Sequence, residues 1–306
     1  MAAPPLPEKQ FYLFGTPIQQ SLSPLMHNTS FQSLHLPYHY SLHETAEVDA
    51  SVVSKMRAPE FGGASVTIPH KLDIMGQLDE ITPEAEAIGA VNTVIPVEVD
   101  AKDGKKKLVG DNTDWLGISY QMKRHLSSTT KVDPTTMRGL VIGAGGTSRA
   151  ALYALHRLGC TDISIYNRTL VRARSVADSF KNLFPVHVLG ANDLISLSSS
   201  ETPQEGFDLI VATVPGTIDS ETMFDGSIFT VGSDADQPRR GVAVELAYTP
   251  RFTRFLKLAK QAGWATVEGG EVLVEQGGWQ ALKWTSQRWD LDSVQSQMDR
   301  VQANRQ

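Results

Sequence analysis

The sequence predicts an α/β protein with two domains, of which the second is built on a doubly wound parallel sheet. The chain has 306 residues, and one domain for about every 150 residues gives two. Between residues 139 and 262, short apolar runs alternate with segments of helical periodicity. This alternation is typical of parallel βαβ units with right-handed crossovers.

Composition excludes several classes of protein. With 41% apolar and 20% charged residues, the chain is neither collagen-like nor disordered. Its net charge of −6 and the absence of a long basic run argue against nucleic-acid binding. No apolar run approaches the roughly 18 residues of a membrane span, and the N-terminus lacks the features of a secretory signal. The single cysteine, Cys160, permits neither an internal disulfide nor a thiolate metal cluster. We therefore expect a cytoplasmic protein without membrane contact.

Residues 1–126 are predicted to form the first domain. The expected strands are 11–15, 37–43, 64–68 and 90–97, and the expected helices are 24–34 and 83–88. Ser23 is the expected N-cap of the first helix, with Pro24 at the first helical position. The polar segment 98–107 is expected to form the tip of a hairpin. Its Lys105–Lys107 run is interpreted as a solvated loop rather than an anion site.

A polar segment rich in Ser and Thr, 127–137, is the expected linker to the second domain, which spans 137–270. The strands expected there are 139–142, 162–166, 208–211 and 242–247, and the helices are 147–158, 170–184 and 250–262. Residues 216–240 are expected to form a long loop, to which no role is assigned. Residues 271–306 are predicted to be helical and to pack back on the first domain, where their tryptophans would cover its core.

A glycine-rich segment follows the strand at 139–142 and opens the helix at 147–158. It consists of Gly143, Ala144, Gly145, Gly146 and Thr147. Glycines in this position let the backbone approach a pyrophosphate, which the amides and the dipole of a helix N-terminus stabilise. The alternative is a turn that only packs the helix on the sheet. Because both flanking elements are of the required type, the segment favours dinucleotide binding.

The end of the next strand indicates which dinucleotide is bound. An NAD site usually carries Asp or Glu about 20 residues after the first glycine, where it binds the ribose 2′-hydroxyl. This chain has Asn167, Arg168 and Thr169 there, and Arg172 follows. No carboxylate would repel a 2′-phosphate, and a guanidinium can bind one through paired hydrogen bonds. We therefore expect NADP, with Arg174 on an exposed helix face.

Polar residues near strand ends of the first domain could hold a polar small molecule. Ser21 and Ser23 are two apart in a segment interpreted as extended, so both hydroxyls can point the same way. Thr67 and Lys71 bracket the end of another strand. The remaining candidates in this half are Asn92 and Asp114. Each residue alone has an ordinary structural explanation, such as a helix cap or a surface lysine.

Several of these residues belong to motifs that follow one another along the chain. The motifs are GTPI (15–18), SLSP (21–24), SVTIPHK (65–71), GAVNT (89–93), NTD (112–114), GAGGTSRAA (143–151) and NRT (167–169), followed by Gln276. From about Phe11 to Trp284 the chain resembles the shikimate dehydrogenases. In the residues around these motifs it is most similar to the shikimate dehydrogenase domain of the fungal pentafunctional arom polypeptide. The resemblance implies that the second domain is a Rossmann-type NADP-binding domain.

The resemblance also implies roles for individual residues. Lys71 and Asp114 would form a catalytic dyad. The substrate carboxylate would be bound by Ser21 and Ser23, the hydroxyls and ring by Thr67, Asn92, Tyr248 and Gln276, and Gly269 would lie on the cofactor side. The implied reaction is the reversible NADPH-dependent reduction of 3-dehydroshikimate to shikimate, a step of aromatic amino acid biosynthesis. The sequence leaves the oligomeric state open.

The implied dyad agrees with the chemistry of such a reduction. A ketone that accepts hydride develops alkoxide charge, which an ammonium group can stabilise and protonate. Asp114 beside Lys71 would orient the amine and favour its charged form. Lysine suits proton transfer better than arginine, which does not release its proton.

No metal site is expected. The eight histidines show no ligand spacing with carboxylates on one helix face. His39 and His43 are four apart but lie in a strand-like segment. His27 and His70 are interpreted as packing or locally hydrogen-bonded residues. Cys160 is expected to be a small buried apolar residue.

Two alternatives remain open from the sequence. One is a quinate or dual quinate/shikimate dehydrogenase of quinate breakdown. Such relatives often carry Thr for the second serine and an acidic residue after the second strand, where this chain has Ser23 and Asn167-Arg168. The other is a non-catalytic metabolite sensor related to the quinate repressor. A sensor would be free to lose Lys71 and Asp114, and both are present.

Overall fold

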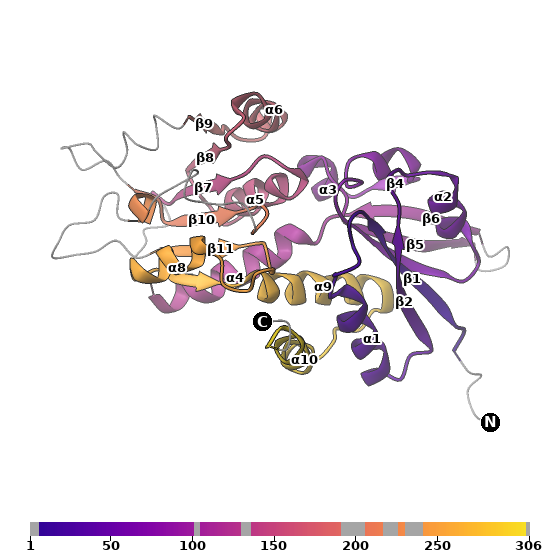
Figure 1. Ribbon diagram of the computed structural model, residues 1–306. Helices are drawn as coiled ribbons and strands as arrows, with labels where there is room; N and C mark the ends of the chain where they lie inside the picture. Colours follow the sequence, from indigo (N-terminus) through magenta and orange to yellow (C-terminus); the bar gives the residue numbers. More distant parts are fainter. Residues whose placement is uncertain are drawn as a thin grey trace. The chain divides into compact units, whose positions relative to one another are not determined.

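The computed structural model describes residues 6–100, 105–129, 136–190, 206–216, 226–229 and 241–303. The chain divides into two compact units, one formed by Met1–Thr113 with Val274–Gln306 and the other by Asp114–Leu273. Each unit contains a six-stranded sheet (Figure 1). The predicted two-domain α/β class is therefore confirmed, including the return of the C-terminal helices to the first unit. None of the described helices has the length and apolar character that a membrane crossing requires.

The sheet of the first unit mixes parallel and antiparallel strands. Its strands are β1 (Lys9–Gly15), β2 (Tyr38–Glu44), β3 (Phe61–Val66), β4 (Glu80–Ile81), β5 (Thr93–Asp100) and β6 (Lys105–Asp111). Their order across the sheet is β2-β1-β3-β5-β6-β4, and β1 is parallel to both of its neighbours. β5 runs antiparallel to β3 and β6. The start of β5 therefore lies at the same edge of the sheet as the ends of β1, β3 and β6.

Local sequence signals explain where several helices of this unit begin and end. The helices are α1 (Ser23–Ser33), α2 (Ala50–Arg57), the 3₁₀ helix η1 (Asp73–Gln77), α3 (Pro83–Ile88), α9 (Gly269–Thr285), which belongs to this unit from Val274 on, and α10 (Leu291–Ala303). The Asp49 carboxylate caps α2 by accepting hydrogen bonds from two amides of its first turn. Thr82 caps α3, and Gly89 ends it in the left-handed conformation with φ 68°.

The expected N-cap of α1 is wrong by one residue. Leu22 occupies the N-cap position, Ser23 is already the first helical residue, and no side chain caps the helix. The reason is that the chain enters the helical region at Leu22, with φ −88° and ψ −4°, whereas a capping residue is normally extended. The Ser23 hydroxyl is therefore not engaged in capping.

The predicted hairpin tip at 98–107 is also too long. Both strands continue into it, and Lys106 and Lys107 lie in register opposite Glu98 and Val97. These lysines are strand residues with their own partners. The Lys106 ammonium donates to the Pro59 and Phe61 carbonyls, and Lys107 pairs with Glu80. Cross-strand pairing and charge partners from other segments outweigh the polar composition that suggested a solvated loop. Residues 101–104 lie outside the described residues.

Alternation along β1 supplies apolar side chains to both faces of the sheet. Phe11 belongs to a core with Phe31 and Tyr40, whereas Phe14 belongs to a core under α2. Trp284 of α9 packs on the first of these cores, with its ring centroid 5.1 Å from that of Phe11. α9 therefore completes this core of the first unit, as predicted for a tryptophan of the C-terminal segment.

The sheet of the second unit is parallel throughout. Its strands are β7 (Arg138–Ile142), β8 (Asp162–Tyr166), β9 (His187–Leu189), β10 (Leu209–Ala212), β11 (Val242–Glu245) and β12 (Ala265–Val267), in the order β12-β11-β10-β7-β8-β9. From β7 the chain builds outward to β9 on one side and, after returning, from β10 to β12 on the other. The strand order thus reverses beside β7. Ligands of open α/β sheets bind at such a switch point.

The helices of the second unit are α4 (Asp114–Thr129), α5 (Gly146–Arg157), α6 (Leu170–Phe180), the 3₁₀ helix η3 (Gly226–Phe229) and α8 (Arg254–Gln261). α4 packs on α5, because Trp115 meets the Tyr153 ring edge-on at 5.3 Å and the Arg157 guanidinium lies over Trp115. This aromatic contact explains why α4 belongs to the second unit, whereas the sequence analysis assigned residues up to 126 to the first.

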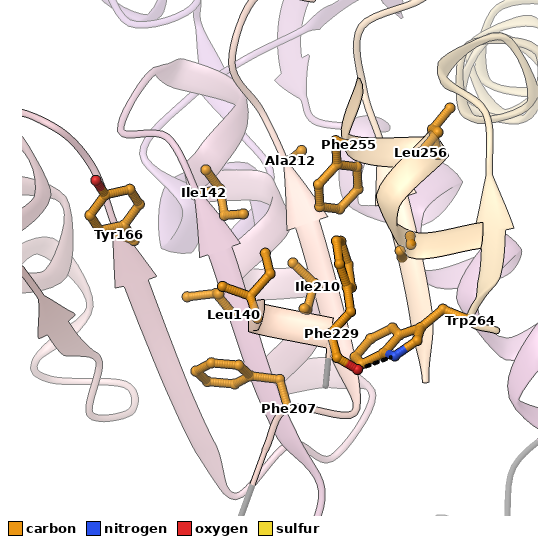
Figure 2. Close-up of a cluster of buried hydrophobic side chains, with 13 residues drawn as sticks. Leu140, Ile142, Tyr166, Phe207, Ile210, Ala212, Phe229, Phe255, Leu256 and Trp264 are labelled. Atoms are coloured by element: carbon orange, nitrogen blue, oxygen red, sulfur yellow. Dashed lines mark hydrogen bonds between the residues drawn. The ribbon is translucent and has the colours of Figure 1, made fainter. Parts of the chain in front are cut away.

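Two predicted irregular segments fall largely outside the described residues. Of the expected linker 127–137, residues 127–129 are the end of α4 and 130–135 are not described. Of the expected loop 216–240, the described part within it is residue 216 and η3. Figure 2 shows how η3 joins the core of the second unit. The Trp264 indole N–H donates to the Phe229 carbonyl at 2.8 Å, and both rings pack among the side chains of β7 and β10.

A buried carboxyl group links β11 to the start of α8. Glu245 is 2% exposed and accepts hydrogen bonds from the Thr253 hydroxyl at 2.8 Å and the Ala247 amide at 3.0 Å. Burial raises the pKa of Glu245 to about 7, although these hydrogen bonds oppose the shift. Thr253 in turn is the N-cap of α8, so α8 begins at Arg254 rather than at residue 250 as predicted.

The docking of α9 predicts a strong effect of a small substitution in β3. A Cβ atom at Gly63, where φ is +151°, would lie 2.4 Å from the Trp284 indole nitrogen. Gly63→Ala is expected to lower the free energy of unfolding by about 1–3 kcal/mol, as measured by urea denaturation. Gly76→Ala is the control, because a Cβ there meets nothing within 4 Å. Equal losses in the two variants would contradict the packing argument.

Burial of Glu245 predicts a contribution to the free energy of unfolding that falls as the pH rises from about 5 to 7. The folded protein keeps the Glu245 proton up to about pH 7, whereas the unfolded chain loses it near 4.5. At this group the folded state therefore binds more protons than the unfolded state, and the contribution of Glu245 to the free energy of unfolding decreases as pH increases. Glu245→Gln should flatten this dependence by about 3 kcal/mol. Urea unfolding at pH 5 and pH 7 measures this change in the free energy of unfolding, and Glu47→Gln, at an exposed position, is the control. The same change in wild type and in both variants would contradict the raised pKa of Glu245.

Candidate active site

The strand arrangement of the first unit gathers polar residues at one edge of its sheet. Ser65 at the end of β3 lies opposite Thr93 at the start of β5, and Thr93 lies opposite Asp111 at the end of β6. The segments that follow β1, β3 and β6 and the segment that precedes β5 therefore meet at this edge. All predicted site residues of the first unit that precede α9 lie in these segments.

Ser21 and Ser23 come together after β1. The Ser21 hydroxyl donates to the Ser23 hydroxyl at 3.2 Å, and the Ser23 amide donates to Ser21 Oγ, also at 3.2 Å. The segment is a turn rather than extended, because the Ser21 amide donates to the Ile18 carbonyl. The hydroxyls nevertheless lie side by side, as their spacing predicted. Two hydroxyls at the N-terminus of α1 suit a carboxylate, which the helix dipole also favours.

Thr67 and Lys71 occupy one turn of chain after β3. The Thr67 amide donates to the Phe14 carbonyl, so this turn is held against the end of β1. A Cβ at Gly15 would lie 2.3 Å from Thr67 Cγ2, which explains the glycine in the GTPI motif. The Lys71 carbonyl accepts the Val91 amide at 2.8 Å, and its side chain is buried, with 6% exposed. A lysine that is buried at a strand end is not the surface residue that the alternative interpretation required.

Asn92 and Gln276 meet, although 184 residues separate them. Asn92 Nδ2 donates to Gln276 Oε1 at 3.3 Å and to Thr113 Oγ1 at 3.1 Å. Thr113 closes the triangle, because its hydroxyl donates to Gln276 Oε1 at 3.1 Å and its amide donates to Asn92 Oδ1 at 2.7 Å. All three side chains are buried. The structure therefore groups two predicted residues and adds Thr113, which the sequence analysis quoted only as part of the NTD motif.

Three further residues of this network were not recognised from the sequence. Gln280 Nε2 donates to the Asn92 carbonyl at 3.1 Å and to Thr93 Oγ1 at 3.0 Å, and Gln280 Oε1 accepts the Ser65 hydroxyl at 2.9 Å. A signal was present, since Gln276, Gln280 and Trp284 recur at every fourth position and so share one face of α9. The Trp284 indole donates to the Val94 carbonyl at 3.0 Å and completes this row of contacts with the start of β5.

An ion pair between a buried carboxylate and an exposed lysine fixes the chain just before the NTD motif. The Asp111 carboxylate binds the Lys283 ammonium of α9 at 2.5 Å and accepts the Thr82 hydroxyl at 2.8 Å. It also accepts the Asn112 amide at 2.7 Å. Asp111 is 4% exposed, so these partners compensate for the burial of its charge. The ion pair holds the end of β6, and with it Thr113, next to α9.

The two histidines near the site are structural, as interpreted from the sequence. His70 Nε2 lies 2.8 Å from the Thr45 carbonyl. His27 is fully buried and stacks on Tyr40 with centroids 4.4 Å apart. Burial lowers the pKa of His27 to about 3, and the neighbouring Gln280 side chain offsets only part of the shift. A neutral imidazole at physiological pH fits an aromatic core.

The second unit presents the glycine-rich loop directly after β7, at the switch point of its sheet. Gly143 has φ +112°, and a Cβ there would lie 2.4 Å from Thr213 Oγ1 of the segment after β10. Gly145 holds the N-cap position of α5 without a capping side chain, and a Cβ there would meet nothing within 4 Å. Ala144, Gly146 and Thr147 complete the loop and the first turn of α5. This backbone can approach an anionic group closely, which fits a dinucleotide pyrophosphate.

The segment after β8 is held in a turn that presents arginines. Asn167 Nδ2 donates to the Thr169 carbonyl at 3.0 Å, and Thr169 occupies the N-cap position of α6. Arg168 and Arg172 are exposed on this turn and on the first turn of α6. No carboxylate stands at this position in the sequence. The donor set fits a 2′-phosphate better than a 2′-hydroxyl.

The remaining predicted residues also belong to the second unit. Asp114 is the first residue of α4 and is half-buried. Tyr248 is half-buried in the segment that Glu245 anchors. Gly269 begins α9, and a Cβ there would lie 2.4 Å from the Ala247 carbonyl oxygen, so Gly269 packs against the segment that carries Tyr248. Lys71 and Asp114, the implied dyad, thus come from different units.

The described residues contain no group of three or more His, Cys, Asp or Glu side chains that could hold a metal ion. Cys160 is buried, and burial, with the nearby Asp208 and Asp162, raises the pKa of its thiol to about 12. It is therefore inert as a nucleophile at neutral pH.

Models of known protein families match parts of both units of the chain. A family model described as the shikimate dehydrogenase substrate binding domain matches residues 13–94, and one described as shikimate / quinate 5-dehydrogenase matches residues 126–199. The pentafunctional AROM polypeptide of Mycosarcoma maydis is 42% identical over 300 residues, which cover 90% of this chain and 17% of that protein. The chain therefore spans about a sixth of the length of such curated relatives.

Solved structures show the same relationship over nearly the whole chain. The dehydroquinate dehydratase and shikimate dehydrogenase from S. pombe AroM is 37% identical with a TM-score of 0.75, covering 95% of this chain and 53% of that one. Shikimate 5-dehydrogenase from Thermus thermophilus in complex with shikimate is 30% identical with a TM-score of 0.76, covering 96% and 99%. A second structure of that enzyme holds NADP(H) and shikimate, at 29% identity, a TM-score of 0.76 and coverage of 95% and 99%. Because this likeness extends over both units, the chain belongs to the shikimate dehydrogenase family.

Proposed function

We propose that the protein is an NADP-dependent shikimate dehydrogenase, which reversibly reduces 3-dehydroshikimate to shikimate. The observation that carries the proposal is the buried Lys71 at a sheet edge that also gathers two serine hydroxyls and the Asn92–Gln276 amide pair. This edge offers donors for a small molecule with a carboxylate and several hydroxyls. Membership in the family and the Thermus thermophilus complex with NADP(H) and shikimate support the same substrate and cofactor.

Lys71 is the proposed proton donor in the reducing direction. A carbonyl carbon that accepts hydride leaves negative charge on its oxygen, and an ammonium at hydrogen-bond distance stabilises that charge and then supplies the proton. The short turn between Thr67 and Lys71 is tied to β1 and to Val91, which fixes the backbone that carries the amine. Asp114 is the proposed partner that orients the Lys71 ammonium and favours its charged form.

The other predicted residues divide the substrate between them. Ser21 and Ser23 are proposed to bind its carboxylate. The residues proposed to bind its hydroxyls and ring are Thr67, Asn92, Tyr248 and Gln276. Neutral amides and hydroxyls suit this task, because a ring with several hydroxyls offers both donors and acceptors and carries no charge of its own there.

The second unit is proposed to bind the cofactor. NADPH supplies the hydride when it is bound. Gly143–Thr147 would cradle the pyrophosphate with backbone amides, and Gly269 would border the site. Arg168 and Arg172 would bind the 2′-phosphate, with Asn167 and Thr169 shaping the turn that carries them.

The proposal is tested by a comparison of four initial rates. Purified protein is given shikimate or quinate, each with NADP⁺ or NAD⁺, and the absorbance of the reduced cofactor is followed. We expect turnover to be dominated by shikimate with NADP⁺. A preference for quinate with NAD⁺ would overturn both the substrate and the cofactor assignment. Binding of shikimate by calorimetry without turnover in any pair would indicate a sensor.

Replacement of Lys71 is expected to separate catalysis from binding. Because the ammonium stabilises charge that develops during hydride transfer, Lys71→Ala should reduce kcat by about 10²–10⁴-fold with a modest change in KM for shikimate. Lys105→Ala, an exposed lysine of β6 in the same unit, is the matched control. Near-normal kcat in Lys71→Ala would remove Lys71 from the mechanism.

The arginine after β8 is expected to set the cofactor preference. Arg168→Ala should raise KM for NADP⁺ by about 10–100-fold, since one or two charge-assisted hydrogen bonds to the 2′-phosphate are lost. KM for NAD⁺, which lacks that phosphate, should change little. Arg174→Ala is the control, because Arg174 is exposed further along α6. If KM rises equally for both cofactors, Arg168 does not recognise the 2′-phosphate.

A further inference from the structure

Two backbone groups determine how the amide side chains at the site are oriented. The Thr113 amide can only donate, so the Asn92 atom 2.7 Å from it is the oxygen Oδ1. The Asn92 carbonyl can only accept, so the Gln280 atom 3.1 Å from it is the nitrogen Nε2. Neither amide can be turned over without placing like groups against each other.

These two orientations set the direction of every hydroxyl between them. Gln280 Nε2 donates its second proton to Thr93 Oγ1 at 3.0 Å. Thr93, with its oxygen occupied as an acceptor, donates its only proton to Asn92 Oδ1 at 2.7 Å. The Ser65 hydroxyl donates to Gln280 Oε1 at 2.9 Å and holds that amide from its other end. The result is a relay from Ser65 through Gln280 and Thr93 to Asn92, in which each group donates to the next.

The relay leaves Asn92 one way of meeting a ligand. Its oxygen already receives two short hydrogen bonds, from the Thr93 hydroxyl and the Thr113 amide. The nitrogen Nδ2 points instead toward Thr113 Oγ1 and Gln276 Oε1, the predicted substrate side of the network, at the longer distances of 3.1 and 3.3 Å. Both Nδ2 protons have these partners, and a substrate oxygen that accepts from Asn92 would replace one of them. Asn92 can therefore meet a ligand as a donor but not as an acceptor.

We propose that Gln280 is a positioning residue that acts through Thr93 to hold Asn92 as a hydrogen-bond donor, so that the site selects a substrate oxygen able to accept. This inference rests on the proposed function, because it assigns Asn92 to the substrate site. Gln280 itself is 1% exposed, and its side-chain amide donates hydrogen bonds to the Asn92 carbonyl and the Thr93 hydroxyl. The Asn92 side-chain amide that it orients is neutral. Gln280 therefore affects which atom of Asn92 faces the ligand, and not the charge of the site.

The relay is tested with a double-mutant cycle. Thr93→Val keeps the shape of the side chain and removes the hydroxyl, and Gln280→Met keeps the length and removes the amide. Each is expected to raise KM for shikimate about tenfold, the worth of one buried hydrogen bond, with KM for NADP⁺ unchanged. Because both act on Asn92 through one chain of hydrogen bonds, the double variant should be no worse than the poorer single variant.

Three controls separate the relay from a merely structural contact. Thr93→Ser retains the hydroxyl and should restore the wild-type KM. Gln287→Met changes an exposed glutamine of the same unit and should have no effect. Costs that add in the double variant, or a Thr93→Ser variant as impaired as Thr93→Val, would overturn the relay, provided that thermal unfolding shows all variants folded at the assay temperature.

A measurement without substrate keeps this inference distinct from the proposed function. In wild-type protein labelled with ¹⁵N at asparagine, the Asn92 side-chain amide, identified by its absence in Asn92→Asp, should exchange slowly with solvent. Thr93→Val and Gln280→Met should each accelerate that exchange at least tenfold. If the wild type fails to oxidise shikimate, the proposed function falls while slow exchange still supports the relay. Unchanged exchange in both variants overturns the relay even if the enzyme is active.

Discussion

The contact between α9 and the first residues of β5 is the interaction on which the proposed substrate site depends. Gln276, Gln280 and Trp284 place a polar group on the same strip of chain at each turn of the helix. A buried donor or acceptor that loses its partner costs roughly 1–3 kcal/mol. A shift of the helix along the strand would break all three contacts at once, so the register of α9 is tightly specified. Apolar packing of Trp284 against Gly63 adds a steric limit to this register.

Reversal of one strand explains why so many short polar motifs meet. In a sheet of parallel strands only strand ends gather at the carboxyl edge. In the first unit β5 runs the other way, so the residues before it join those that follow β1, β3 and β6. The second unit uses the other solution, a parallel sheet whose strand order reverses beside β7 and leaves room for the glycine-rich loop. Each unit thus gathers its candidate site residues at one edge of its sheet, by a different topology.

Buried carboxylates are treated differently in the two units. Asp111 pairs with Lys283 and fixes the end of β6. Glu245 has hydrogen bonds from Thr253 and Ala247, and burial raises its pKa to about 7. The difference follows from the cost of burying an unpaired charge, which proteins avoid by pairing or by neutralisation. The amide network at the proposed substrate site avoids the problem altogether, because all of its members are neutral.

Features that depend on neighbouring residues along the chain could be predicted from local sequence patterns. Alternation of apolar runs and helical segments predicted the parallel sheet of the second unit. The strand before Gly143 and the helix after it predicted the position of the glycine-rich loop that is proposed to bind the dinucleotide. Asn167 and Arg168 could be selected as candidate cofactor-binding residues because they directly follow a predicted strand. Family motifs then indicated Lys71, Asn92 and Gln276, whose proposed roles await the measurements above.

Hydrogen bonds between residues far apart in the chain could not be predicted in this way, because they follow from how the elements pack. Ser65 and Gln280 are 215 residues apart, and Gln280 and Thr93 are 187 apart, so no local pattern pairs them. The assignment of α4 to the second unit likewise depends on aromatic contacts with α5, and the length of the β5–β6 hairpin depends on cross-strand partners. Local propensity determines where helices and strands form. The hydrogen-bond partners of buried polar groups depend instead on how elements that are distant in the sequence pack together.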